Sequence, residues 1–104
     1  MENILAERTI TLDVDRKPQR SIRMMIGKPV LLDENEWSIP YEIHGPGADQ
    51  IERRELYGFD AWQVLRLAFW FVPEQVINRV PMGSRLTCEG NENWSAERRV
   101  LPPP

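Results

Sequence analysis

The chain has 104 residues, of which 41% are hydrophobic and 28% charged, and its formal net charge is −3. These values are ordinary for a globular protein, and we expect one domain over residues 1–104. The single cysteine, Cys88, excludes an internal disulfide framework. No apolar run approaches the roughly 20 residues that span a bilayer, so we expect no membrane contact. The mildly acidic charge lacks the basic footprint of a nucleic-acid-binding protein, which excludes nucleic acid as the expected partner.

Two strands are predicted near the N-terminus. Residues 4–14 alternate between apolar and polar side chains, which is typical of a half-buried strand. A second strand is predicted from about Arg20. One of its faces carries Ile22, Met24 and Ile26. Gly27-Lys28-Pro29 interrupts this strand, because proline cannot donate to the ladder, and apolar residues resume at 30–32.

The third predicted strand, residues 36–44, has the clearest alternation. One face carries Trp37, Ile39, Tyr41 and Ile43. Pro40 is compatible with a strand that lies at a sheet edge, or with a position whose N–H needs no partner. With its two predecessors this strand predicts an antiparallel β-meander over residues 4–45, with one apolar face. Residues 48–56 are charged and poorly patterned, and we expect a connection with at most one helical turn.

A helix is predicted after Asp60, whose carboxylate can accept N–H groups of the first turn. Gln63, three residues later, completes a spacing like that of a capping box. A helical wheel gives one continuous stripe for packing on the sheet. It contains Ala61, Val64, Leu65, Ala68, Phe71 and Val72. Because Pro73 clashes with the preceding turn, we expect this helix to end at about Val72.

The remaining elements are less strongly patterned. A short second helical segment is predicted through residues 74–78, within a helical region at 60–80. An additional strand is predicted at the start of residues 84–100, where Trp94 would anchor the segment, and residues 101–104 are expected to form an exposed proline tail. The predicted fold class is therefore α+β: an antiparallel three- to four-stranded β-meander packed against one main α-helix, with a short second helical segment.

Residues that carry chemistry are sparse. His44 is the only histidine and Cys88 the only cysteine, and no pair of residues has the spacing of metal ligands. We therefore expect no catalytic residue, no metal site and no cofactor. The first residues lack the basic and apolar regions of a signal peptide, which, with the single cysteine, predicts a cytoplasmic protein.

The other side of the predicted helix carries an unusual group of side chains. Trp62, Arg66, Phe69 and Trp70 lie away from the alanine-containing stripe. Tryptophan and arginine are enriched in the hot spots of protein interfaces. Two explanations remain open for this group. Residues 84–100, with Trp94, could cover it within the chain, or another protein or a second copy of this chain could do so.

Several short motifs together resemble those of a family of short uncharacterised bacterial proteins, over about residues 4–72. The motifs are Ala6-Glu7-Arg8-Thr9, Ile26-Gly27-Lys28-Pro29, Trp37-Ser38-Ile39-Pro40-Tyr41-Glu42-Ile43-His44-Gly45, Tyr57-Gly58-Phe59-Asp60 and Gln63-Val64-Leu65-Arg66-Leu67-Ala68. The resemblance implies a stand-alone meander-plus-helix domain of bacterial origin with no assigned activity. This chain departs from the family at Trp62 and at residues 69–71, where aromatic side chains replace small or aliphatic ones. In size and style the chain is also similar to immunity proteins of bacterial toxin systems.

Three functions are consistent with these observations. The leading hypothesis is a non-catalytic protein-binding module of the bacterial cytoplasm, of immunity or antitoxin type. The second is a small enzyme or ligand-binding domain that uses a pocket near Tyr41, His44, Tyr57 and Asp60. The third is a structural subunit that forms homo-oligomers. The expected partner is another protein or a second copy of the chain.

Overall fold

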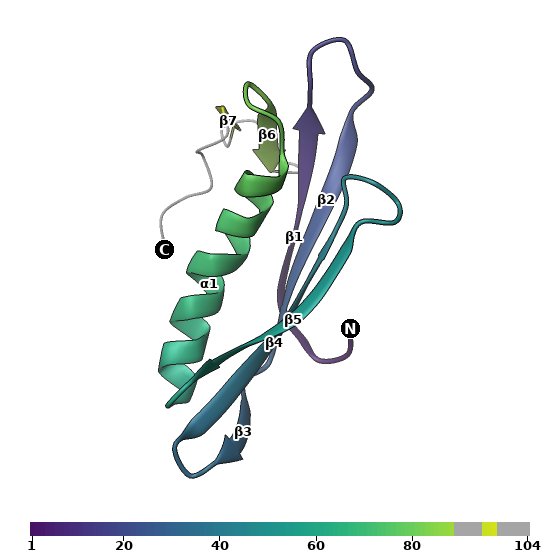
Figure 1. The fold of residues 1–104 in the computed structure, drawn as a ribbon. Coiled ribbons are helices and arrows are strands. Elements are labelled where there is room, and N and C mark those ends of the chain that lie inside the picture. Colours follow the sequence, from purple (N-terminus) through teal and green to yellow (C-terminus); the bar gives the residue numbers. More distant parts are fainter. Residues whose placement is uncertain (89–94, 98–104) are drawn as a thin grey trace.

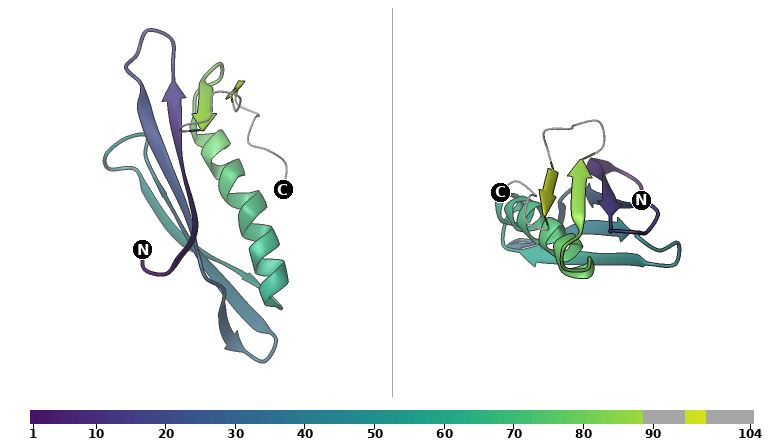
Figure 2. Two further views of the ribbon diagram at one scale, coloured as in Figure 1. Left: turned by 180° about the vertical axis from the view of Figure 1, so that it is seen from behind. Right: turned by 90° about the horizontal axis from the view of Figure 1, so that it is seen from above.

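A computed structural model of the chain describes residues 1–88 and 95–97. These residues form an antiparallel sheet and one helix, which confirms the α+β fold. Helix α1 (Ala61–Arg79) lies along one face of the sheet (Figures 1 and 2). The strands, in chain order, are β1 (Ile4–Asp13), β2 (Arg20–Gly27), β3 (Val30–Asp33), β4 (Glu36–His44), β5 (Ile51–Gly58), β6 (Arg85–Cys88) and β7 (Ser95–Glu97).

Strand β4 organises the sheet. Along one edge it pairs with β5 over its whole length from Trp37 to His44, and along the other edge it pairs first with β3 and then with β2. Strand β1 pairs with β2 and, through its second half, with β6, which pairs in turn with β7. The described residues thus contain seven strands rather than the predicted three to four. Strand β5 pairs with the outer edge of β4, whereas β6 pairs with β1 near the other end of the sheet. Helix α1 joins β5 to β6 and so carries the chain across one face of the sheet.

Pro40 lies where β2 ends and β3 begins. Strand β2 stops pairing with β4 at Tyr41, and β3 resumes the pairing at Ser38. Gly45 and Gln50 form a hydrogen-bonded pair of the β4–β5 ladder, so Pro40 and Glu55, five residues further along, form a pair without hydrogen bonds to each other. The missing N–H of Pro40 therefore faces this interruption, where no ladder partner is needed. The second of the two conditions predicted for Pro40 is therefore the one that the fold meets.

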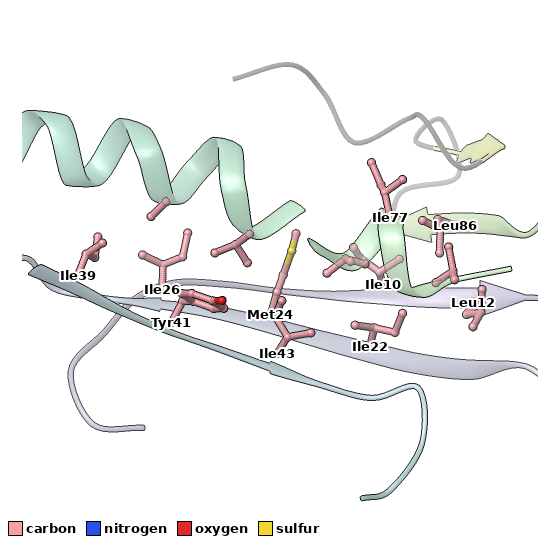
Figure 3. Close-up of a cluster of buried hydrophobic side chains, with 14 of the residues drawn as sticks. Ile10, Leu12, Ile22, Met24, Ile26, Ile39, Tyr41, Ile43, Ile77 and Leu86 are labelled. Carbon is pink, nitrogen blue, oxygen red and sulfur yellow. The ribbon is translucent and has the colours of Figure 1, made fainter. Parts of the chain in front are cut away.

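The core lies between the sheet and the helix. The predicted apolar faces of β1, β2 and β4 all point toward α1, and Figure 3 shows their side chains converging there. The fully buried members include Ile10, Leu12, Ile22, Ile39, Ile43, Val64, Ala68, Val72 and Leu86. The predicted helix stripe is therefore confirmed at its centre, while Ala61, Leu65 and Phe71 are only partly buried. Helix α1 makes its contacts with β4, β5 and β2.

The predicted end of the helix is wrong. Helix α1 continues through Pro73 to Arg79, and there is no separate second helical segment in the described residues. Proline at position 73 removes the hydrogen bond to the carbonyl group of Phe69, which lies on the exposed side of the helix where water can replace the lost donor. Beyond Pro73 the helix buries Val76 and Ile77, and this burial favours continuation over a break.

The prediction for residues 48–56 is also wrong, because β5 begins at Ile51. The alternation of apolar and polar side chains that marks a strand is missing here, because four consecutive residues are charged: Glu52, Arg53, Arg54 and Glu55. Charged residues are nevertheless common on edge strands. The additional strand expected after residue 84 is confirmed as β6, which pairs with β1. Trp94 and the proline tail at 101–104 lie outside the described residues.

Candidate functional site

The first turn of α1 is fixed by a capping arrangement that the sequence predicts. The Oδ1 atom of Asp60 accepts the backbone N–H of Gln63 at 2.7 Å, and the Oε1 atom of Gln63 accepts the N–H of Phe59 at 2.8 Å. These two bonds satisfy N–H groups that have no partner within the helix. They also set where the helix starts, and hence which side chains of the following turns face away from the sheet.

We call Trp62, Arg66, Phe69 and Trp70 together the outer face of α1. Trp62 is 77% exposed, Trp70 49% and Phe69 45%, and Arg66 is also exposed. They are spaced at i, i+4, i+7 and i+8, so they follow one side of the helix over about 12 Å. On the opposite side of the same helix Val64, Ala68 and Val72 are fully buried. The structure therefore brings all four predicted interface residues onto one exposed surface.

The predicted internal cover for this face would come from residues 84–100. The parts of this segment that the structure describes are β6 and β7, which extend the sheet beyond β1. Trp94 lies between them, outside the described residues. The two large indole side chains of the outer face are among the more exposed apolar groups of the molecule.

A second exposed apolar group was not predicted as a surface. Val30, Leu31 and Leu32, on β3, are 46%, 57% and 50% exposed. The β3–β4 hairpin extends past the first turn of α1 (Figure 1), so α1 does not cover these residues. The signal was present in the sequence, because three consecutive apolar residues in a strand cannot all point to the same face.

The four residues of the predicted pocket do not come together. Tyr41 is buried on the side of the sheet that faces α1. His44 lies three residues further along β4, so it points to the opposite face, and Tyr57 pairs with Ser38 on that face too. Asp60 is occupied as the cap of the helix. The structure therefore provides no shared site for these residues.

Tyr41 instead belongs to a chain of polar contacts between the sheet and the end of α1. Its hydroxyl group donates to Glu52 of β5. The other carboxylate oxygen of Glu52 accepts from Arg79 at 2.9 Å, and Arg79 also donates to the carbonyl oxygen of Gly45 at 3.1 Å. Burial, and then the hydrogen bond to Glu52, raise the pKa of Tyr41 to about 12. The phenol is therefore held neutral as a donor, in a structural role, with Phe71 in edge contact at 6.0 Å between ring centres.

A second polar cluster lies on the face of the sheet away from α1. Glu42 is buried, and its Oε1 atom lies 2.8 Å from His44 Nε2 and 3.1 Å from Arg53 Nε. The amino group of Met1 is 3.7 Å from Oε2. The hydrogen bond with His44 lowers the pKa of Glu42 and the bond from Arg53 lowers it further, against the opposing effect of burial. Glu42 is therefore a charged acceptor for its neighbours.

The described residues contain neither a cluster of metal ligands nor a membrane-spanning helix. Within residues 1–88 and 95–97, no three histidine, cysteine, aspartate or glutamate side chains gather as a metal site would require. No helix in the same part of the chain is long and apolar enough to cross a membrane.

The comparisons with known proteins give one match. The sequence model of a family described as a domain of unknown function (DUF6968) matches residues 6–97. Comparison with curated proteins and with solved structures gives no match. The expectation of an uncharacterised domain family is thereby confirmed, and the match extends well beyond residue 72, where the resemblance in the sequence ended.

Proposed function

We propose that this chain, which belongs to the DUF6968 family of domains of unknown function, is a non-catalytic protein-binding module whose contact surface is the outer face of α1. One observation carries the proposal. Two tryptophans, a phenylalanine and an arginine are exposed in a single row on a helix whose other side is locked into the core. Tryptophan and arginine are the side chains that most often dominate binding energy in protein interfaces.

The rigidity of α1 supports a binding role for its outer face. The helix is capped by Asp60 at its start and joined to β5 and to Gly45 through Arg79 at its end. A surface held at both ends loses little conformational freedom on binding, so more of the interaction energy appears as affinity. Burying one large aromatic side chain is worth about 1.5–3 kcal/mol, and this energy is available to a partner that covers Trp62 and Trp70.

The charges of the outer face indicate the chemistry of the partner. Arg66 lies at its centre and has no ion-pair partner among the described residues. A partner that buried Arg66 without a carboxylate would leave a desolvated, unpaired charge. We therefore expect an apolar groove with an acidic group at its centre. As a bacterial cytoplasmic domain of immunity or antitoxin type, the chain would use this face to mask a toxin.

The test is affinity capture from the source lysate with three versions of the chain. The wild type should recover a partner, and the double variant Trp62→Ala/Trp70→Ala should not. Leu31→Ala/Leu32→Ala is the matched control, because it removes comparable exposed apolar groups from β3 and should retain the partner. Recovery of the same partner by the tryptophan variant would contradict the proposal, as would recovery of none by the wild type.

A further inference from the structure

Among the described residues, one edge of the sheet is open along the whole of β5. Strand β4 is the only described strand that pairs with β5, over the eight residues from Ile51 to Gly58. The outer edge of β5 therefore presents backbone N–H and C=O groups without a strand partner in the described part of the chain. Such an edge is a template for pairing with another strand.

The register of β5 identifies which groups face outward. At the start of the hairpin the N–H of Gly45 donates to the carbonyl oxygen of Gln50 at 2.8 Å. In an antiparallel ladder every second residue directs its backbone N–H and C=O groups to the neighbouring strand, and the residues between direct theirs to the opposite edge. Because Gln50 bonds to β4, the even-numbered residues of β5 also bond to β4. The outward groups therefore belong to Ile51, Arg53, Glu55 and Tyr57. The side chains of these four residues also share the face of the sheet away from α1.

We propose that β5 pairs antiparallel with β5 of a second copy of this chain, with Arg54 on the two-fold axis. In this register Arg53 lies opposite Glu55 of the second copy, and Ile51 lies opposite its Tyr57. Each of these pairs occurs twice because of the symmetry. Both are hydrogen-bonded pairs of the new ladder, since all four residues direct their backbone groups outward.

Complementarity of the side chains supports this register. Ile51 is 47% exposed and Tyr57 56% exposed in the single chain, and the pairing covers each with the other. Arg53, whose side chain is 67% exposed, meets the carboxylate of Glu55 in the second copy. On the face toward α1, each Arg54 lies diagonally across from Glu52 of the other copy. The two arginines on the axis are thus flanked by two carboxylates.

A neighbouring register fits less well. A shift of two residues places Arg53 opposite its own counterpart and Ile51 opposite Glu55. Both registers place one arginine opposite its own counterpart, Arg54 in the proposed register and Arg53 in the shifted one, but the shifted register loses the apolar pair. The shifted register places Glu52 opposite Arg54 of the other copy, so the loss of the pair of Ile51 with Tyr57 is what separates the two registers. Because the contact is a single strand, we expect a dimer that dissociates on dilution rather than a permanent one.

Sedimentation equilibrium of the full chain at increasing concentration tests the pairing. The wild type should form a dimer, and Glu55→Arg should weaken association about tenfold or more by placing arginines opposite one another. The double swap Arg53→Glu/Glu55→Arg should restore it, because the opposed pair regains opposite charges. Glu34→Arg, at the exposed tip of the β3–β4 hairpin, is the control with the same change of net charge. A wild type that stays monomeric at all concentrations, or a dimer indifferent to Glu55→Arg, would overturn the proposal.

Cysteine cross-linking tests the register directly, and its first variant, Arg54→Cys, keeps the contact of Arg53 with Glu42. In a Cys88→Ser background, Arg54→Cys places two thiols opposite each other across the axis, within the range of a disulfide. Arg53→Cys is the control, because residue 53 lies opposite residue 55 of the second copy and the two thiols do not face each other. Oxidation should link the first variant into dimers and leave the second unlinked. Linking of the second variant alone, or of neither, would contradict the arrangement. Trp62→Ala/Trp70→Ala leaves β5 unchanged and should dimerise like the wild type. Failure of the dimer proposal and failure of the proposed binding function can therefore be distinguished.

Discussion

The ring of Pro40 on β4 lies directly against Gly27 at the end of β2. A Cβ atom placed on Gly27 would be 2.7 Å from the Cγ atom of Pro40, closer than real side chains approach. The proline needs the break between β2 and β3 because it has no N–H, and the glycine makes room for its ring. The two residues thus explain together why the strand running alongside β4 is interrupted here.

Gly27→Ala should therefore destabilise the fold by about 1–3 kcal/mol, because the rigid ring of Pro40 cannot move aside easily. Denaturant unfolding measures this change. Gly47→Ala is the control, since its new Cβ would meet only the flexible side chain of Gln50. In a Pro40→Ala background the cost of Gly27→Ala should shrink. An equal cost in both backgrounds would show that the two residues do not interact.

Ala68→Leu should cost about 1–3 kcal/mol, because Ala68 is fully buried between α1 and the sheet and leaves no room for a larger side chain. Ala48→Leu makes the same chemical change at an exposed position and should have little effect. Thermal unfolding of the two variants distinguishes the positions. If Ala68→Leu melted at the wild-type temperature, the packing of the helix described above would be incorrect.

Pro73→Ala should stabilise the protein by about 1–3 kcal/mol, because alanine restores the N–H that can bond to Phe69 and has a higher helix propensity. Part of the gain is offset, since proline also restricts the unfolded chain. The measurement is the free energy of unfolding in urea. A loss of stability would indicate that the helix depends on proline at this position.

Stability at alkaline pH should depend on Tyr41. Its pKa is raised to about 12 in the folded state from an ordinary value near 10. The unfolded state therefore loses this proton first, and the stabilisation by the neutral phenol, complete below about pH 10, is lost as the pH rises toward 12. Tyr41→Phe removes this titration. The wild type should lose up to about 2 kcal/mol more than the variant over that interval, and parallel pH profiles would contradict the assignment.

The elements that the sequence predicts correctly are those with a regular apolar pattern. Alternation located β1, β2 and β4, and the wheel identified both the buried stripe and the exposed row with Trp62 and Trp70. The pattern failed where another requirement dominated. Charges suited to a sheet edge concealed β5, and burial of Val76 and Ile77 carried the helix past Pro73. The contacts of Tyr41 with Glu52 and of Glu52 with Arg79 depend on the register of β4 and β5 and on the helix position, which no local pattern encodes.

The affinity of Trp70→Ala for the captured partner, measured by calorimetry together with the thermal stability of the variant, tests the binding role of the outer face most directly. Trp70 lies away from the buried stripe, so the variant should keep the wild-type melting temperature. The lost contact should weaken binding by about tenfold to a hundredfold. A variant that binds with wild-type affinity, or one that unfolds without a change in association, would contradict the proposal that this face is the binding surface.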